Sequence, residues 1–130
     1  MGLTHVTVRV QNLTSEDSFT EDFLVDTAAW SSFAPASKLK RIGIQPIGKK
    51  IFELANGEPE EYEYGIAKLE FMDELIATRI IFGPDKAEPL LGVAALEDAG
   101  FLVDPVNQTL RKLSVLPLKA LAPAEIAIAS

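Results

Sequence analysis

The sequence contains no cysteine and only one histidine, His5, in 130 residues. Without cysteine the chain cannot form disulfide bonds, thiolate metal sites or a cysteine nucleophile. A zinc site of the usual His and Cys type is excluded for the same reason. A Ser-His-Asp triad would have to use His5, and no Gly-x-Ser-x-Gly motif accompanies it. We therefore expect no metal and no cofactor, and carboxylate chemistry is what remains.

Basic residues and long apolar runs are also scarce. The 12 Lys plus Arg against 19 Asp plus Glu give a formal net charge of -7. Binding to a phosphate backbone requires clustered Lys and Arg, so we expect no nucleic-acid partner. No run reaches the length of about 18 apolar residues typical of a membrane span, and no secretory signal pattern is present. The expectation is a soluble, cytoplasmic protein that does not associate with membranes.

The composition is that of a globular protein, with 48% hydrophobic and 24% charged residues. A compact monomer of this size buries about two-thirds of the surface that its unfolded chain exposes, which is enough for one core. We expect one domain over residues 1–116 and an Ala- and Pro-rich C-terminal tail over residues 117–130.

Short segments with β-strand patterns dominate the chain. Residues 1–10 alternate valines with polar side chains, residues 11–22 have the composition of a polar connection, and Phe23–Val25 are typical of a short buried strand. Asn56-Gly57 predicts the tight turn of a long hairpin, and Gly65 predicts a break in its second strand. Further strands are expected over residues 44–48, 49–55, 60–64, 66–71, 75–82, 101–104 and 110–116.

Two short helices complete the predicted elements. One lies within residues 35–43, with Ser37 as its N-terminal cap and Gly43 as its stop. The other covers residues 93–99 and ends at Gly100. With many strands and only two short helices, the predicted fold class is mainly β.

Asp26 is the acidic residue that the sequence places in a position suited to catalysis. The apolar run Phe23–Val25 brings it to the end of a strand, and small residues follow it, so backbone groups can hold its carboxylate. An acid in this position also has a structural interpretation, as the side chain of a turn or a helix cap. Phe101–Asp104 repeats the tetrapeptide that ends in Asp26, but Pro105 follows it, and we interpret Asp104 as a turn residue.

Three features of the sequence resemble the retroviral-type (retropepsin-like) aspartic proteases. The segment Phe23–Ala29 is similar to the family's hydrophobic-hydrophobic-Asp-Thr-Gly-Ala loop, and Leu90–Leu96 is similar to its second signature, an apolar pair and a glycine that lead into a short helix. The Asn56-Gly57 hairpin lies between them, where the family carries its flap. The resemblance covers residues 1–116 and is closest to the bacterial single-domain branch.

The resemblance implies a closed β-barrel with one or two short helices that works as a homodimer. Its implied activity is that of an aspartic endopeptidase that cleaves an extended peptide between apolar side chains without a cofactor. Asp26 of each subunit would form the catalytic dyad, with Thr27 holding the two loops together. The implied substrate contacts are Ala28, Ala29, Trp30, Ala55, Asn56, Gly57 and Leu91, the hairpin residues closing over the peptide.

Two residues depart from the family loop: Ala28 stands where the family has glycine, and Trp30 where it has a polar residue. They leave open an altered specificity, an engineered loop, or a catalytically inactive dimer that binds a peptide or a partner strand. Trp30 itself fits a core anchor as well as a cleft lining. A monomeric β-barrel of unrelated role is the remaining alternative.

Acidic residues cluster on the predicted hairpin. A solvated face explains them better than recognition of a basic substrate. They are Glu53, Glu58, Glu60, Glu61 and Glu63.

Overall fold

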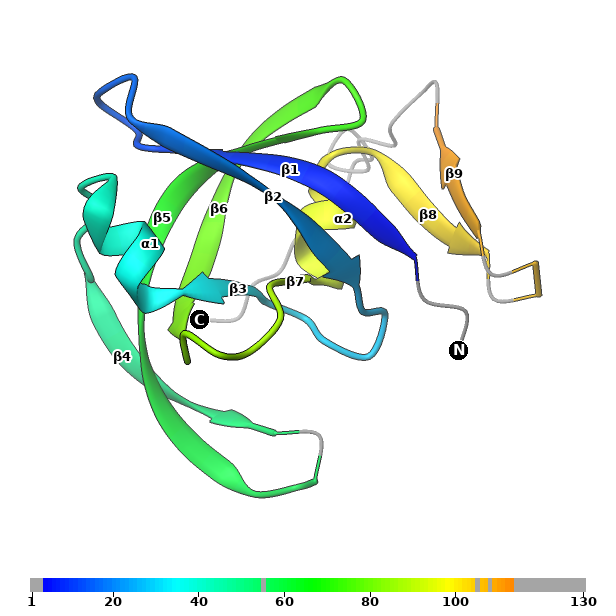
Figure 1. Cartoon of the computed structure of the whole chain (residues 1–130). Helices are drawn as coiled ribbons and strands as arrows, with labels where there is room; N and C mark the ends of the chain where they lie inside the picture. The colour runs from blue at the N-terminus through cyan, green and yellow to red at the C-terminus, as the bar shows by residue number, and fades with distance from the viewer. Residues whose placement is uncertain (1–3, 55, 105, 108, 114–130) are drawn as a thin grey trace, which may run out of the picture.

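The computed structural model describes residues 4–54, 56–104, 106–107 and 109–113. These ranges contain nine strands and two short helices, arranged as a small barrel from which one hairpin projects (Figure 1). In chain order the elements are β1 (His5–Gln11), β2 (Ser18–Val25), β3 (Ser32–Pro35), α1 (Ala36–Arg41), β4 (Gly48–Glu53), β5 (Pro59–Phe71), β6 (Glu74–Gly83), β7 (Leu90–Leu91), α2 (Val93–Asp98), β8 (Phe101–Asp104) and β9 (Thr109–Lys112).

Six of the strands close into a ring. The sheet order is β1-β2-β7-β3-β6-β5-β4, and β1 also pairs with β5, so that β4 alone lies outside the ring, on the edge of β5. Two of the pairings are parallel, β2 with β7 and β3 with β6. Closure gives each strand of the ring a partner on both sides, and the remaining edge of the sheet belongs to β4. The prediction of a mainly β, closed-barrel fold with two short helices is confirmed.

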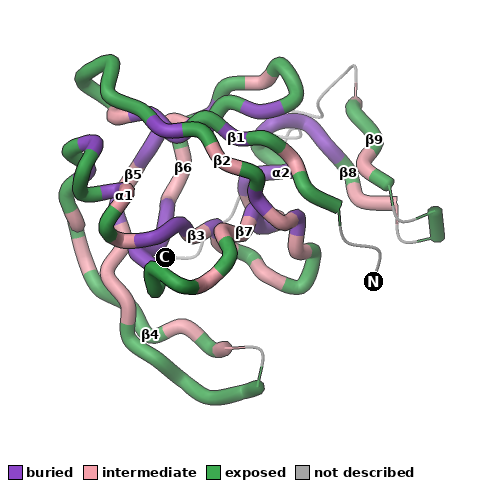
Figure 2. Tube along the Cα trace, viewed as in Figure 1, coloured by how far each residue is buried: buried purple, intermediate pink, exposed green. Residues whose placement is uncertain are grey.

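Apolar side chains from every strand of the ring fill the interior of the barrel. Figure 2 marks the buried residues along the backbone. Along β5, Gly65, Ala67, Leu69 and Phe71 are buried and the residues between them are more exposed, as expected for a strand with one face on the core. Each large apolar side chain that is fully buried stabilises the fold by roughly 1.5–3 kcal/mol. The largest of these are Phe23, Phe71, Leu39, Leu69, Ile80, Leu91 and Leu96.

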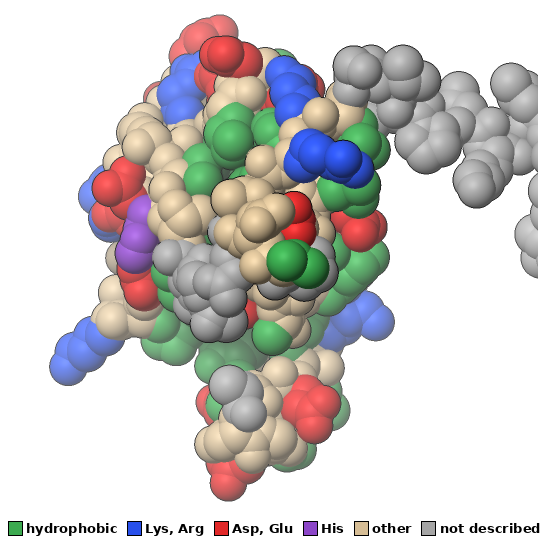
Figure 3. All heavy atoms as spheres, turned by 90° about the vertical axis from the view of Figure 1, so that its right-hand side faces the viewer, with side chains coloured by type: hydrophobic (Ala, Val, Ile, Leu, Met, Phe, Trp, Pro, Cys, Tyr) green, Lys and Arg blue, Asp and Glu red, His purple; other side chains and the backbone are tan. Residues whose placement is uncertain are grey.

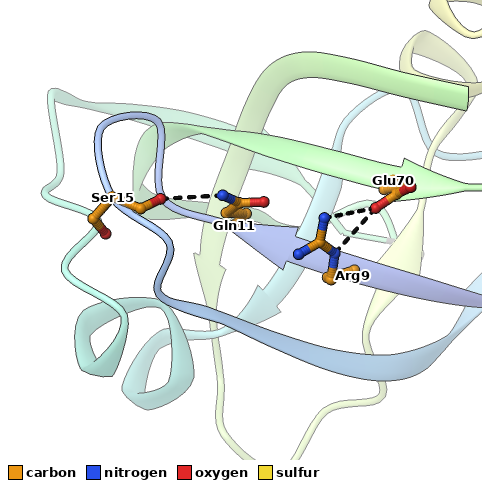
Figure 4. Close-up of polar contacts among 4 residues, drawn as sticks. All are labelled: Arg9, Gln11, Ser15 and Glu70. Atoms are coloured by element: carbon orange, nitrogen blue, oxygen red, sulfur yellow. Dashed lines mark hydrogen bonds and ion pairs between the residues drawn. The ribbon is translucent and has the colours of Figure 1, made fainter.

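The seam between β1 and β5 is held by a polar pair on its outer surface (Figure 4). Arg9 and Glu70 are directly opposite each other, and the Arg9 Nε and Nη2 donate to Glu70 Oε1 at 3.0 and 2.8 Å. At the end of β1, the buried Gln11 donates from Nε2 to the Ser15 carbonyl at 3.1 Å. The Arg9–Glu70 bonds stabilise the pairing of β1 with β5 that closes the ring, and the Gln11–Ser15 bond stabilises the β1–β2 loop.

Both helices end at the predicted glycines, which have positive φ values of 86° at Gly43 and 90° at Gly100. The predicted cap at Ser37 is wrong. Pro35 occupies the N-cap position of α1, and the Ser37 N–H instead donates to Asp85 Oδ1 at 3.0 Å. The acceptor therefore comes from the loop after β6 and not from the helix's own sequence.

Several elements differ from the sequence prediction. The strand predicted over residues 44–48 is wrong, because residues 44–47 form no strand and β4 begins at Gly48. β2 begins at Ser18, inside the predicted polar connection, because Phe19 is buried and continues the alternation of the strand. Gly65 does not break β5, which runs through it on the core face. β3 was not predicted, since its four residues are too few to display a pattern.

A separate two-stranded sheet, β8 with β9, lies beside the barrel. Phe101 packs its ring against Phe71 at a centroid distance of 6.1 Å, and Lys112 Nζ lies 2.8 Å from Glu74 Oε2. The strand predicted over residues 110–116 is represented by β9, which ends at Lys112. The predicted tail over residues 117–130 lies outside the described residues, and the domain boundary stays a prediction.

Candidate active site

Asp26 directly follows β2, where this strand runs parallel to β7. Leu24 pairs with Leu90 and Val25 pairs with Leu91. The Asp26 N–H then donates to the Leu91 carbonyl at 3.1 Å. Asp26 lies at a strand end because the apolar run Phe23–Val25 stops there. The tertiary structure fixes the Asp26 backbone against β7.

The loop after Asp26 folds back on the aspartate. The Ala28 N–H donates to Asp26 Oδ1 at 3.0 Å, and the Ala29 N–H donates to the Asp26 carbonyl at 3.2 Å. The Asp26 side chain thus stabilises a turn, as the alternative to catalysis in the sequence analysis predicts. Asp26 is partly buried. Within the described residues no hydrogen bond engages Oδ2, so this oxygen is free for a water molecule or a second carboxyl group.

The start of α2 holds this loop in place. The Val93 N–H donates to the Ala29 carbonyl at 2.8 Å, and the Ala94 N–H donates to the Trp30 carbonyl at 3.0 Å. The first N–H groups of a helix lack partners within it, so the loop supplies these acceptors. The two segments that the sequence analysis singled out, one at residues 23–29 and one at residues 90–96, therefore form a single hydrogen-bonded unit.

Gly92 lies where these segments cross. A Cβ atom at this position would be 2.6 Å from the Trp30 carbonyl oxygen and 2.7 Å from the Ser31 carbonyl atoms. The Gly92 N–H donates to Ser32 Oγ at 2.9 Å, and Ser32 is buried. Ser32 was not predicted as a residue of the site, because a serine beside another serine has no motif that marks it as a partner of a residue 60 positions away.

The remaining predicted residues of the loop occupy different environments. Thr27 and Ala28 are exposed and Ala29 is partly buried. Trp30 is 65% exposed, so its interpretation as a core anchor is wrong in this chain. Leu91 is fully buried, so its carbonyl, not its side chain, faces the Asp26 loop. Their roles in catalysis and substrate binding stay predictions.

Ala28 fits the loop without backbone strain. Among the described residues, the non-glycine residues with positive φ are Met72 and Asp73, which form the β5–β6 turn. Ala28 does not need the left-handed conformation that favours glycine. The departure from the family pattern therefore adds one exposed methyl group at a position that does not require glycine.

The hairpin of β4 and β5 projects from the barrel and carries the predicted flap residues (Figure 1). The turn at its tip is longer than predicted. The Leu54 N–H donates to the Glu58 carbonyl and the Gly57 N–H to the Leu54 carbonyl, both at 2.8 Å. Asn56 Oδ1 accepts the Glu58 N–H at 2.9 Å. Asn56 and Gly57 are exposed at this tip, and Ala55 lies outside the described residues.

The hairpin is acidic, and Asp and Glu side chains mark the lowest lobe of the molecule in the space-filling view (Figure 3). Glu53, Glu58, Glu60 and Glu61 are exposed and Glu63 is partly buried. Desolvation raises the pKa of Tyr62, and the neighbouring Glu60 carboxylate raises it further. This exposure agrees with the solvated-face interpretation of the acids.

Two other residues weighed in the sequence analysis lie away from the Asp26 loop. Asp104 accepts the Val106 N–H at 3.0 Å and the Asn107 side-chain amide at 2.9 Å, which confirms it as a turn residue. Hydrogen bonds from Asn107 lower the pKa of Asp104. His5 Nε2 lies 2.5 Å from Glu88 Oε2, so the lone histidine is hydrogen-bonded to Glu88 at the start of β1.

In the described ranges, no three His, Asp or Glu side chains come together in a group that could hold a metal ion. None of the helices in the same ranges is long and apolar enough to cross a membrane. A cytoplasmic location stays a prediction.

Solved structures with a similar fold include a retroviral protease and a retroviral protease-like domain. The EIAV protease in complex with the inhibitor HBY-793 aligns with a TM-score of 0.55 and 19% identity, over 75% of this chain and 88% of that chain. The retroviral protease-like domain of Ddi1 from Leishmania major aligns with a TM-score of 0.50 and 16% identity, over 86% and 90%. A retropepsin-like aspartic protease from Rickettsia conorii has a TM-score of 0.42 and 19% identity, over 78% and 85%.

Neither family models nor curated proteins match the sequence. At these identities the structural matches show the fold, and the first two span most of both chains. The bacterial single-domain branch stays a prediction. The closed barrel, the Asp26 loop and the projecting hairpin, together with these matches, show that the chain has the retropepsin-like aspartic protease fold.

Proposed function

We propose that the protein is an aspartic endopeptidase that acts as a homodimer, with Asp26 of each subunit forming the catalytic dyad. The observation that carries the proposal is the setting of Asp26: it is partly buried at the end of β2, its Oδ1 accepts the Ala28 N–H, and its backbone is bonded to Leu91. This setting fixes the carboxyl group while leaving Oδ2 for chemistry.

One chain provides half of the dyad. Two carboxyl groups that share a site cannot both ionise, because the second negative charge is strongly disfavoured beside the first. A twofold axis that brings two copies of the Asp26 loop together supplies the second carboxyl group from an identical surface. The exposed Thr27 is adjacent to Asp26 and is proposed to hold the partner's loop.

The proposed reaction is hydrolysis of a peptide bond by a water molecule. The ionised carboxylate takes a proton from water, whose oxygen attacks the peptide carbonyl, while the protonated carboxyl group donates its proton to the carbonyl oxygen. Breakage of the C–N bond, with a proton passed to the leaving nitrogen, gives a carboxylic acid and an amine. No metal or cofactor takes part in these steps.

The substrate in this proposal is an extended peptide with apolar side chains at the cleaved bond. The projecting β4–β5 hairpin supports this class, because its exposed tip at Asn56 and Gly57 can close over a peptide and exclude water. The exposed Trp30 supports an apolar lining near Asp26.

The test is replacement of Asp26 by Asn, with peptide cleavage measured from acidic to neutral pH. We expect the D26N variant to lose cleavage, since an amide can neither take nor donate the proton. Asp104→Asn is the matched control, because the same Phe-Leu-Val sequence precedes Asp104, and this variant is expected to cleave normally. A wild-type protein that cleaves no peptide, or a D26N variant that cleaves as well as the wild type, would overturn the proposal.

A catalytically silent dimer that binds a peptide or a partner strand is the second candidate function. The exposed methyl group of Ala28 and the 65% exposed Trp30 support it, since both occupy the loop that carries Asp26. Ala28→Gly separates the two candidates. Gain of cleavage in the variant would identify a disabled protease site, whereas retained peptide binding without cleavage would favour the binding function.

A further inference from the structure

The root of the β4–β5 hairpin is a single residue, Tyr64. It pairs with Gly48, the first residue of β4, and also with Ile81 of β6. Toward the barrel β5 pairs with β6, and toward the tip it pairs with β4 alone. Among the residues that the structure describes, the hairpin beyond Tyr64 is therefore a two-stranded ribbon with no third strand to orient it. Such ribbons are only marginally stable by themselves.

The Tyr64 side chain lies between two groups at this root. The Arg79 guanidinium carbon is 4.4 Å from the centroid of the Tyr64 ring, a distance typical of a cation–π contact. On the other strand, Gly48 leaves space for the ring: a Cβ atom there would be 2.7 Å from the Tyr64 hydroxyl oxygen and 2.9 Å from Cζ. The Ile47 N–H also donates to the Tyr64 carbonyl at 2.8 Å.

Within the described part of the chain the Lys and Arg ion pairs involve residues other than Arg79, so no carboxylate competes with the Tyr64 ring for its guanidinium group. It belongs to β6 and pairs with Ile66, two residues along β5 from Tyr64, so both side chains lie on the same outer face of the sheet. The contact therefore connects the barrel, through β6, with the first residue pair of the hairpin.

We propose that Tyr64 is a positioning residue for the hairpin, clamped between Arg79 and Gly48, and that this clamp fixes the direction in which the hairpin leaves the barrel. The clamp matters for the proposed function because a hairpin that closes over a peptide must start from a defined direction. The expected effect of the clamp on peptide cleavage therefore rests on the proposed function. We expect loss of the clamp to leave the Asp26 loop in place, since within the described residues no hydrogen bond joins Tyr64, Arg79 or Gly48 to this loop. The expected effect is on substrate binding and not on the chemical step.

The test uses three changes that break the clamp in different ways. Tyr64→Leu removes the ring, Arg79→Met removes the cation and keeps an apolar stem, and Gly48→Ala displaces the ring with a methyl group. Tyr64→Phe is the conservative control, because it retains the ring. Tyr62→Leu is the matched control, because it removes a tyrosine two residues nearer the tip on the same face of β5.

The first readout is amide hydrogen exchange in β4, compared with that in β6 of the same sample. We expect each of the three clamp-breaking variants to exchange about twofold to fivefold faster in β4, with β6 unchanged, because a partly exposed cation–π contact is lost. Tyr64→Phe and Tyr62→Leu are expected to keep the wild-type rate at residues 49 and 50, next to the root. Unchanged exchange in β4 of folded variants would overturn the proposal.

The second readout is peptide cleavage. We expect the KM of the three clamp-breaking variants to rise about twofold to fivefold with kcat unchanged. The Tyr64→Phe variant is expected to have the wild-type KM. A fall in kcat with unchanged KM would overturn the positioning role. If the wild-type protein cleaves no peptide, the proposed function fails, while the exchange experiment still decides whether the clamp exists. If Tyr64→Leu does not fold, Arg79→Met and Gly48→Ala decide the outcome.

Discussion

Asp26 and Asp104 show how residues with the same local sequence acquire different roles. Each follows a Phe-Leu-Val run at the end of a strand, and each accepts a backbone N–H two residues later. Asp104 lies in the turn of a two-stranded sheet beside the barrel. Asp26 lies at a junction where β7 and α2 meet its loop, so the tertiary contacts distinguish the two aspartates.

Gly92 is the residue at which a single methyl group should disturb the candidate site most. Gly92→Ala places a Cβ atom within 2.7 Å of the Trp30 and Ser31 backbone, which cannot move without breaking the bonds to α2. We expect a loss of roughly 1–3 kcal/mol in the free energy of unfolding, as for other overpacked positions. Urea unfolding followed by tryptophan fluorescence measures it, with Trp30 as the reporter.

The same variant should also lose cleavage, because the displaced loop carries Asp26. A Gly92→Ala protein with wild-type unfolding free energy would contradict the close approach described for this residue. Loss of stability with full cleavage would show instead that the loop relaxes without moving Asp26.

Among the elements, α1 depends on an acceptor that lies far from it in the sequence. Pro35 at its N-cap provides no side-chain hydrogen bond, and Asp85 accepts the Ser37 N–H. Hydrogen bonds with Ser37 lower the pKa of Asp85, desolvation partly opposes this lowering, and the charge of Lys40 lowers the pKa by a smaller amount. The ionised form of Asp85 is therefore the form that stabilises the fold.

The lowered pKa of Asp85 predicts a pH-dependent contribution to stability. This contribution is complete above the ordinary carboxyl value of 3.8 and is lost as the pH falls through the lower value of the folded state. We expect Asp85→Ala to lower the melting temperature at neutral pH, and the difference from the wild type to shrink with acidification. Melting temperatures measured across this pH range give the comparison.

Asp98→Ala is the control for this series, because Asp98 is exposed at the last residue of α2, where a negative charge is unfavourable. It should not lower the melting temperature at neutral pH. A constant difference between Asp85→Ala and the wild type at every pH would assign the effect to packing and not to the carboxylate.

At the scale of the whole molecule, the proposed function requires two chains for one active site. Specific activity should therefore fall on dilution, as dimers dissociate. When wild-type and D26N chains are mixed in equal amounts and exchange subunits, about one quarter of the dimers contain two wild-type chains. We expect the mixture to cleave peptide at about one quarter of the rate of wild-type protein at the same total concentration.

Peptide cleavage after subunit exchange, together with light scattering at the same concentrations, checks this prediction. Cleavage that falls only in proportion to the wild-type fraction would show that each chain works alone. A monomer at every concentration that cleaves peptide would contradict the dimeric site directly.

The sequence by itself determined the fold class and the position of Asp26. Alternating and short apolar segments reveal strands, and a carboxylate after a buried strand has to lie at the strand's end, since both signals are local. The Asn56-Gly57 hairpin and the glycines that end both helices follow from conformations that few residues adopt. The resemblance to the retropepsin-like loop came from the same short segments.

Only the tertiary structure decided which segments meet. Several contacts join residues that lie far apart in the chain. They are the pairing of β1 with β5 that closes the barrel, the pairing of the short strand β3 with β6, the bond from Gly92 to Ser32, and the pairing of Tyr64 with Ile81 at the hairpin root. A strand of two to four residues has no periodicity to detect, and a partner is chosen by the packing of the whole core. For this reason the local sequence predicted the catalytic candidate, whereas the surroundings that hold it required the folded chain.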